Sequence, residues 1–300
     1  MSKFQALHLG LVVRGHGRHY IVEDADGRRL VCHPRGKKSD AVVGDLVRFA
    51  DTGDEGVIEA VEPRRNLLFR QDEWKTKSFA ANLDQMLVLV AVEPVFSESQ
   101  LARALIAAES AGIRMAIALN KTDLPGADAA RGRLAPYRAM GLTVFEVALK
   151  ADPAGSRATL MPWLKGQRSF VLGPSGTGKS TLINLLVQDA QAQVGEISQA
   201  LNSGRHTTTT TQWYWTDATR STALIDSPGF QQFGLGQIAA ADLWRFMPDL
   251  REHAHCRFAN CSHVHEPGCG VRAALEQGLI SASRYRIYCE ILEELQRKTW

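Results

Sequence analysis

The stretch GPSGTGKST, at positions 173 to 181, constrains the fold of this chain more than any other feature. It matches the pattern G-x-x-x-x-G-K-[ST] and lies between an apolar run, SFVL, and an amphipathic stretch, TLINLL. A strand, a phosphate-binding loop and a helix in this order are typical of α/β nucleotide-binding domains. The alternative is an incidental glycine-rich turn, and the flanking strand and helix argue against it.

Each residue type in this loop has a physical task in holding phosphates. Glycines let backbone N–H groups turn inward, where the N-terminus of the following helix adds a favourable field. Lys179 is expected to reach the β- and γ-phosphates and to act in catalysis, and Ser180 is expected to ligate Mg²⁺. The predicted phosphate-binding residues are Gly173, Pro174, Ser175, Gly176, Thr177, Gly178, Lys179, Ser180 and Thr181.

A second motif, ALNKTDLPG at 118 to 126, ends a buried strand earlier in the chain. The carboxylate of Asp123 can accept from guanine N1–H and N2–H together, whereas adenine offers no such donor pair. Asn120 can bond the base edge or pin the phosphate loop, and the stem of Lys121 can cover one face of the ring. With Thr122, these residues predict a preference for GTP over ATP. The structural alternative is a turn that caps a helix. The functional alternative is an ATPase or kinase, which would share the phosphate loop but would not use this motif.

A switch and an acidic motif follow the phosphate loop. DSPG at 226 to 229 comes after the apolar strand TALI. Asp226 is expected to act through the water shell of Mg²⁺, and Gly229 to offer its N–H to the γ-phosphate. The polar segment GRHTTTTTQ, at 204 to 212, is predicted to be a mobile switch in which Thr207 or Thr208 ligates Mg²⁺ while GTP is bound. The alternative for the threonine run is an edge strand of β-branched residues.

The residue after DSPG is Phe230, where many GTPases place the glutamine that orients the attacking water. His206 is the nearest candidate replacement, because an imidazole can orient or deprotonate water at neutral pH. A purely structural histidine is the alternative. Slow intrinsic hydrolysis, accelerated when a partner orders the switch, is therefore expected.

Three cysteines and a histidine gather near the C-terminus, in the pattern Cys256-x4-Cys261-x-His263-x5-Cys269. This is the ligand set of a closed tetrahedral zinc site, and the absence of an open position predicts one structural Zn²⁺. His255 and His265 are competing imidazoles, and buried free cysteines are the alternative to a metal. The segment has few large apolar residues, so it is expected to be poorly ordered without metal.

Hydrophobic patterning divides the rest of the chain. Five short apolar stretches with Gly- and Asp-rich turns, between about 8 and 70, predict a small barrel of the OB-fold type. The charged stretch 66–79 is expected to be an irregular linker. From 85 to 120 a strand, a helix and a second strand predict a βαβ unit and a parallel sheet. The last segment, 281–300, has apolar residues at helical spacing and predicts a helix that packs on its neighbours.

Charge and apolar content limit the class of protein. The chain has 35 Lys and Arg against 32 Asp and Glu, so any nucleic-acid surface must be local. Candidate basic clusters are Arg35, Lys37 and Lys38, and Arg64, Arg65 and Arg70. No secretory signal or apolar run of membrane-spanning length is present, and five cysteines fit a reducing compartment, so a cytoplasmic protein without membrane contact is expected.

These motifs in this order resemble the ribosome small subunit-dependent GTPase A family. The similarity also covers VVGDLVRF, PRRNLLFR, ANLDQMLVLVAVEP, GRHTTT and FGL, so it runs through nearly the whole chain. The resemblance implies a circularly permuted GTPase, in which the guanine-reading motifs precede the phosphate loop, the switch and the magnesium motif. It implies an OB-fold domain over 1–78, a GTPase domain over 79–235 and a mainly helical zinc-binding domain over 236–300.

The resemblance also implies a function. GTP would be hydrolysed to GDP, with turnover stimulated by the small ribosomal subunit and release of the protein after hydrolysis, late in subunit maturation. The expected partners are that subunit and its ribosomal RNA, and a monomer is expected. The chain departs from the family at VALKADPAG, where a Ser-Ala-Lys-like loop is common, so the second guanine contact at 148–150 is left open. A nucleic-acid-binding module with a vestigial nucleotide site is the remaining alternative.

Overall fold

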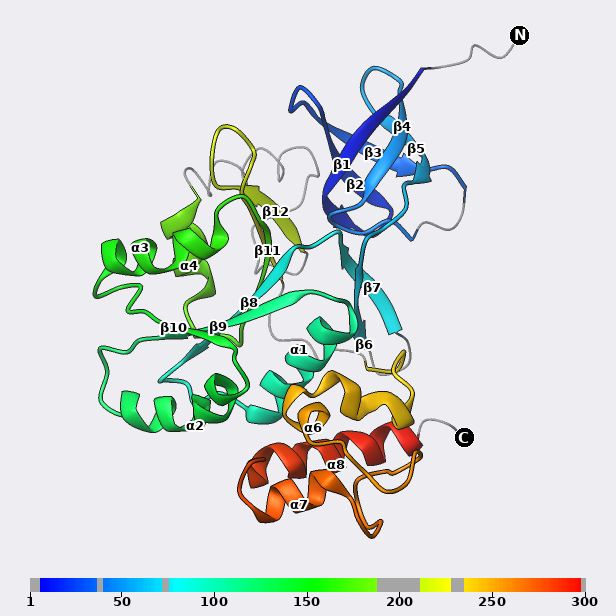
Figure 1. The fold of residues 1–300 in the computed structure, drawn as a ribbon. Coiled ribbons are helices and arrows are strands. Elements are labelled where there is room, and N and C mark those ends of the chain that lie inside the picture. Colours follow the sequence, from blue (N-terminus) through cyan, green and yellow to red (C-terminus); the bar gives the residue numbers. More distant parts are fainter. Residues whose placement is uncertain (1–5, 37–39, 72–75, 188–210, 228–234, 298–300) are drawn as a thin grey trace.

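The computed structural model describes residues 6–36, 40–71, 76–187, 211–227 and 235–297. A barrel, a helix-flanked sheet and a set of C-terminal helices follow one another along the chain (Figure 1). The multidomain fold class predicted from the sequence is confirmed, with a closed five-stranded barrel before an α/β sheet. None of the helices in these ranges is long and apolar enough to span a bilayer.

The barrel is built from five strands: β1 (Leu7–His16), β2 (His19–Asp24), β3 (Arg29–Pro34), β4 (Leu46–Asp51) and β5 (Gly56–Val61). The strand order is β1-β2-β3-β5-β4, and β4 pairs back to β1, which closes the barrel. Only the β3–β5 pairing is parallel among these strands. This is the OB-fold arrangement expected from the sequence. Val12, Val22, Val47 and Phe49 fill the interior.

The α/β sheet has the strand order β10-β9-β8-β11-β13-β12. Its strands are β8 (Gln85–Ala91), β9 (Arg114–Asn120), β10 (Thr143–Glu146), β11 (Arg168–Leu172), β12 (Gln212–Trp215) and β13 (Ala223–Asp226). All neighbours are parallel except β12, which runs antiparallel to β13. The sequences of β8 and β9 are nearly continuous apolar runs because helices cover both faces of the sheet.

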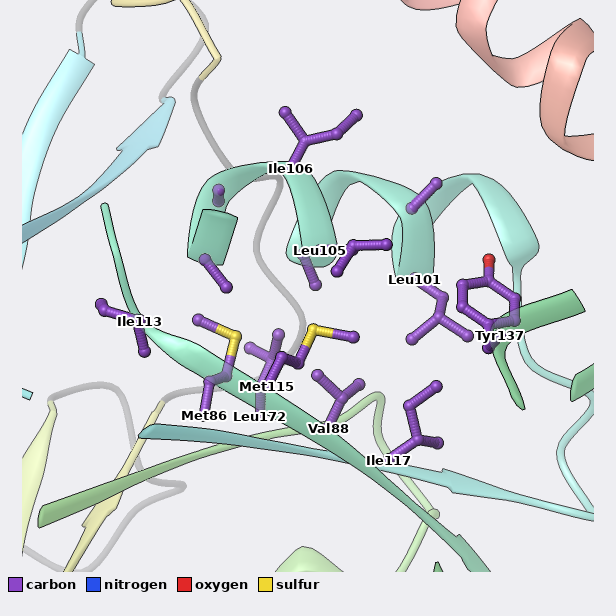
Figure 2. Close-up of a cluster of buried hydrophobic side chains, with 14 of the residues drawn as sticks. Met86, Val88, Leu101, Leu105, Ile106, Ile113, Met115, Ile117, Tyr137 and Leu172 are labelled. Carbon is purple, nitrogen blue, oxygen red and sulfur yellow. The ribbon is translucent and has the colours of Figure 1, made fainter. Parts of the chain in front are cut away.

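Helices α1 (Glu98–Ser110) and α2 (Ala127–Ala139) lie on one face, and α3 (Pro153–Leu164) and α4 (Lys179–Leu186) lie on the other. Figure 2 shows Leu101 and Leu105 of α1 above Val88 of β8 and Ile117 of β9. The hydroxyl of Ser97 accepts from the N–H of Gln100 at 3.3 Å and so caps the start of α1. The result is a three-layer α/β domain.

The expectation of an irregular linker at 66–79 is wrong. This stretch forms an antiparallel hairpin of β6 (Leu67–Gln71) and β7 (Thr76–Ala81). Side-chain amides close its base: the Asn66 Oδ1 accepts from Leu83 N at 2.9 Å, and the Asn82 Nδ2 donates to Gly44 O of the barrel at 2.9 Å. The residues that make these contacts lie outside the two strands. The charged stretch itself has no alternation of apolar and polar residues, so its sequence did not indicate a hairpin.

The C-terminal part consists of a 3-10 helix, η1 (Ala240–Phe246), followed by α6 (Pro248–Glu252), α7 (Gly270–Glu276) and α8 (Ala282–Arg297). The predicted C-terminal helix is confirmed, with Ile287, Ile291 and Leu295 buried. It packs against α1, where Arg103 pairs with Glu294. The domain that carries the cysteines is therefore attached directly to a helix of the α/β domain (Figure 1).

Barrel and α/β sheet are joined by strand pairing. Strand β1 pairs with β12, with Arg14 opposite Gln212, so the two parts form one sheet of eleven strands. The strand β12 was not expected from the sequence, because QWYW is short and has no alternation. Its first residue, Gln212, is the last residue of the segment that the sequence predicts to be the switch.

Candidate nucleotide site and metal centre

The guanine motif and the phosphate loop line one cavity of ≈ 620 Å³, although they are far apart in the chain. They meet because the carboxyl ends of parallel strands, here β9 and β11, lie at the same edge of the sheet. The described residues that line it are Asn120, Lys121, Asp123, Leu124, Leu149, Lys150, Pro174, Ser175, Gly176, Gly178, Lys179, Ser180 and Thr181. The permuted order of the motifs therefore leaves the pocket intact.

The phosphate loop requires glycine for geometric reasons. Gly176 and Gly178 have φ of +80° and +104°, which L side chains rarely adopt. A Cβ at Gly178 would lie 2.4 Å from the Nδ2 of Asn120. At Gly173 a Cβ would lie 2.6 Å from the carbonyl oxygen of Leu89. The loop can thus lie close to its neighbours, in a conformation that side chains at these positions would prevent.

Asn120 pins the phosphate loop, which is one of the two roles left open by the sequence. Its Nδ2 donates to the carbonyl of Thr177 at 2.8 Å. Its Oδ1 accepts from the N–H of Leu149 at 3.0 Å. Asn120 is buried, so both amide atoms are used in fixing three loops to one another. These two hydrogen bonds hold the loops of the pocket together.

The remaining guanine-motif residues lie at the pocket wall or behind it. Lys121 adopts a left-handed backbone, with φ +62°, and its Nζ donates to the carbonyl of Glu93. Asp123 is exposed at the wall, where its carboxylate can meet a base. Thr122 does not line the cavity, and its hydroxyl donates to Val147 O at 3.1 Å. Lys150 lines the cavity beside Leu149, which brings the 148–150 loop to the site.

Lys179 and Asp226 form an ion pair at 3.4 Å beside the phosphate loop. Burial raises the pKa of Asp226 above the ordinary value, and the Lys179 ammonium partly opposes this. The Oδ1 of Asp226 is buried, and the ammonium of Lys179, at 3.4 Å, is the partner that the described residues supply to it. A buried carboxylate oxygen next to a phosphate cradle, which would be freed if this lysine turned to a phosphate, suits the water shell of Mg²⁺. The residues present therefore fit a nucleotide bound with magnesium.

Several predicted residues cannot be placed. His206, Thr207, Thr208, Gly229 and Phe230 lie outside the described residues, so their roles in catalysis and magnesium binding remain predictions. Thr177 is described and buried, and its hydroxyl donates to Pro174 O at 2.8 Å within the loop.

The four predicted metal ligands lie together. The Sγ atoms of Cys256, Cys261 and Cys269 and a ring nitrogen of His263 all lie within 4.8 Å of one another. The Nδ1 of His263 is 3.3 Å from Cys256 Sγ and 3.5 Å from Cys269 Sγ. The competing imidazoles, His255 and His265, are exposed and outside the cluster. The geometry thus favours the histidine chosen from the spacing.

Burial favours the neutral form of both kinds of ligand in this cluster. Burial raises the pKa of the Cys261 thiol to about 12 and lowers the pKa of His263. A bound divalent cation would reverse the effect on the thiol, because thiolate is the form that coordinates metal. Three thiolates and one imidazole leave no open position, as in structural zinc sites.

Two tyrosines that the sequence did not single out hold the ligand loop. The hydroxyl of Tyr285 donates to His263 O at 2.8 Å, and that of Tyr288 donates to Ser262 O at 2.8 Å. Both are on α8, so the helix positions the backbone on either side of the candidate ligand. Their spacing in SRYRIYCEIL indicates only a helix face, so no local signal could have revealed this task.

The candidate RNA-binding arginines whose side chains are described form ion pairs within the protein. The guanidinium of Arg64 forms two hydrogen bonds of 2.8 Å with Asp45, which is buried in the barrel. Arg65 pairs with Asp84 at 2.8 Å. Lys37, Lys38 and the side chain of Arg70 lie outside the described residues. Arg35 remains largely exposed while it pairs with Glu59.

Comparison with known proteins decides the family. A family model described as RsgA GTPase matches residues 61–236. The chain belongs to the RsgA GTPase family. A relative from Variovorax paradoxus, the small ribosomal subunit biogenesis GTPase RsgA, is 60% identical over 98% of this chain and 94% of its own length. A relative of the same name from Bordetella pertussis is 54% identical over 95% of each chain.

Solved structures agree with this family assignment. The crystal structure of YjeQ from Thermotoga maritima has a TM-score of 0.72 and 31% identity, and covers 97% of this chain and 99% of that one. The structure of YloQ, a circularly permuted GTPase, has a TM-score of 0.70 and shares the fold at 24% identity, over 99% of this chain and 98% of that one. Membership of the RsgA GTPase family makes this chain a GTPase, with the motif order of a circular permutation.

Proposed function

We propose that this GTPase binds the small ribosomal subunit and assists its late maturation. The observation that carries the proposal is the 60% identity, over nearly the full length, to a protein named for small ribosomal subunit biogenesis. The guanine motif and phosphate loop that line one cavity support the nucleotide part of this function. Acting on ribosomal subunits, the protein would work in the cytoplasm, as a monomer.

The chain's own residues would hold the nucleotide in three places. Asp123 accepts from the guanine edge, Lys179 leaves its ion pair with Asp226 to contact the β- and γ-phosphates, and Ser180 and Thr207 contribute oxygen atoms. Magnesium bound with the nucleotide would offset the charge that develops during phosphoryl transfer. Asp226 would be freed as Lys179 moves, and its buried carboxylate would then be available to hold the water shell of that ion.

Hydrolysis would depend on an ordered switch. Phe230 cannot orient a water molecule, and we assign that task to His206, with Gly229 donating its N–H to the γ-phosphate. The subunit would stimulate turnover by ordering the segment that carries His206, and the protein would be released after hydrolysis.

The barrel and the C-terminal domain would supply the contacts to the subunit. An OB-fold barrel is a common RNA-binding module, and exposed arginines such as Arg35 are candidates for ribosomal RNA phosphates. One structural Zn²⁺ held by Cys256, Cys261, His263 and Cys269 would fix the shape of the C-terminal surface.

Co-sedimentation tests the partner. Purified small subunits are mixed with the full chain and GDP, GTP or a non-hydrolysable GTP analogue, and GTP turnover is measured with and without subunits. We expect stronger co-sedimentation with the analogue than with GDP, and faster turnover with subunits. Equal binding in all nucleotide states and no stimulation would contradict the proposal. Large subunits at the same concentration provide the matched control.

A binding measurement tests the nucleotide separately. Fluorescent GDP should bind more tightly than fluorescent ADP to the same preparation. Tighter ADP binding would overturn the assignment of Asp123 without bearing on the ribosomal partner.

A further inference from the structure

A row of polar residues crosses the junction between the barrel and the α/β sheet. Arg14 of β1 lies opposite Gln212 of β12, and Gln212 lies opposite Asp226 of β13. Side chains directly opposite one another on paired strands point to the same face of a sheet. The row therefore begins in the barrel and ends at the carboxylate beside the phosphate loop.

Two members of this row have buried donors without a hydrogen bond. Nε and Nη1 of Arg14 and Nε2 of Gln212 donate no hydrogen bond within the described part of the chain, and Oδ1 of Asp226 meets there only the ammonium of Lys179, at 3.4 Å. Gln212 is 2% exposed and Asp226 is 7% exposed. Buried polar atoms are nearly always hydrogen bonded, so two groups with unpaired donors, in register with a buried carboxylate, call for a physical reason.

The row lies on the same face of the sheet as α4. Tyr214 and Leu224, two positions along β12 and β13 from Gln212 and Asp226, pack with Leu182 of α4. Asp226 is paired with Lys179, the first residue of α4. Donors at Arg14 and Gln212 thus stand in line with an acceptor whose present counter-ion is expected to move to the phosphates.

The barrel also holds the rest of β12 and the turn that follows it. The Nε1 of Trp215 donates to the Oε1 of Glu23 of β2 at 2.7 Å. Arg220, in the turn before β13, donates to the carbonyl of Asp26 at 3.4 Å. Strand β12, on the barrel side of the sheet, is therefore attached to the barrel at its start, at its end and at its turn (Figure 1).

We propose that Gln212 and Arg14 are positioning residues for Asp226. When Lys179 turns to the phosphates, the Nε2 of Gln212 donates to the Oδ1 of Asp226, and Arg14 donates to the amide oxygen of Gln212 and fixes its orientation. The position of the barrel then sets the position of the carboxylate at the magnesium water shell. The inference rests on GTPase activity and on the proposed role of Asp226, and is independent of the ribosomal partner.

Removing the donors tests the row. For Gln212→Leu and Arg14→Met we would measure the affinity for fluorescent GDP at equilibrium across a Mg²⁺ titration, and then kcat and KM for GTP. We expect about a tenfold increase in the Mg²⁺ concentration at half-effect, as for lost outer-shell partners of a metal site. At saturating Mg²⁺, kcat should fall with little change in KM. Arg14→Lys, which keeps a cationic donor, should restore part of the loss.

Two variants serve as controls. Arg28→Met removes another arginine of the barrel. Arg28 is exposed, pairs with Asp51 at 2.7 Å and is not part of the row. Trp215→Phe removes the donor to Glu23 and leaves the row intact. Both should keep the Mg²⁺ dependence of the unmodified protein.

Asp226→Asn separates the two ways in which the proposal can fail. If it shifts the Mg²⁺ dependence while Gln212→Leu and Arg14→Met do not, the row is structural and the proposal is wrong. If Asp226→Asn itself causes no shift, the assigned role of Asp226 is wrong, and so is the proposal that Gln212 and Arg14 position it. If Gln212→Leu does not fold, the comparison of Arg14→Met with Arg14→Lys tests the proposal. An equal Mg²⁺ dependence of GDP affinity in these two variants would overturn it. The double variant Arg14→Met/Gln212→Leu gives a further test. If its shift in the Mg²⁺ concentration at half-effect equals the product of the two single shifts, the two residues act independently, which contradicts the proposal.

Discussion

The nucleotide pocket and the Cys/His cluster are assembled in opposite ways. The pocket joins loops distant in the chain, and Asn120 connects them through hydrogen bonds to Thr177 and Leu149. The cluster is local, with all its ligand atoms between Cys256 and Cys269. A pocket built by internal hydrogen bonds is preformed, whereas a cluster of sulfur atoms at ligand distances depends on the ion that it would bind. Ligand removal should therefore affect the two regions differently.

The largest effect is expected from metal removal. Chelation, or Cys261→Ser, should lower the stability of the C-terminal domain by several kcal/mol, because metal binding there contributes to folding. Metal analysis should show about one zinc per chain, lost in the variant, and near-UV circular dichroism should report the unfolding. Cys289→Ser, which changes a half-buried cysteine of α8 outside the cluster, is the control. Retention of zinc by Cys261→Ser would contradict the ligand set.

The next largest effect concerns turnover. Lys179→Ala should lower kcat for GTP by about 10²–10³-fold, as for loss of one charged contact to a transition state. The pocket should stay folded, since the loop is held by Asn120 rather than by this lysine. Thermal unfolding and single-turnover kinetics measure the two effects. Lys165→Ala, at an exposed position after α3, should behave as the unmodified protein. Unchanged turnover in Lys179→Ala would remove it from the site.

Replacing a loop glycine tests whether the pocket is preformed. Gly178→Ala combines a positive φ with a Cβ placed 2.4 Å from Asn120 Nδ2. We expect a stability loss of about 1–3 kcal/mol together with weaker GDP binding. Gly141→Ala has a similar φ of +81° but meets nothing within 4 Å, so it isolates backbone strain from the collision. Denaturant unfolding and GDP titration distinguish them, and equal GDP affinity in both would mean that the Asn120 contact is dispensable.

The smallest effect is on base choice. Asp123→Asn should reduce the preference for GDP over ADP by about tenfold, since the charged acceptor for two guanine donors is lost. Asp128→Asn, whose side chain is 98% exposed in the first turn of α2, is the matched control. Competition between the two fluorescent nucleotides gives the ratio, and the same preference in both variants would count against the guanine contact.

Much of the fold could be predicted because its signals are local. Apolar runs indicated β8 and β9, and glycine spacing indicated the phosphate loop before α4. The β6–β7 hairpin and β12 were among the elements that were not expected. The hairpin is closed by Asn66 and Asn82 through contacts with residues outside it, and β12 is fixed by pairing with both β13 and β1. Neither segment has a periodic pattern of apolar residues that would indicate those partners.

The sequence by itself determined the chemistry of this protein: which residues can cradle phosphates, which carboxylate can accept from guanine, and which sulfur and nitrogen atoms can hold a cation. Those properties belong to side chains and to short spacings, so they can be read without a fold. Only the tertiary structure decided that Asn120 pins the phosphate loop, that His263 joins the cysteines, and that Arg14 of the barrel stands in line with Asp226. The first and the last depend on contacts between segments distant in the chain, which form only when the sheet brings them together. The place of His263 depends on how its loop is held by Tyr285 and Tyr288 of α8.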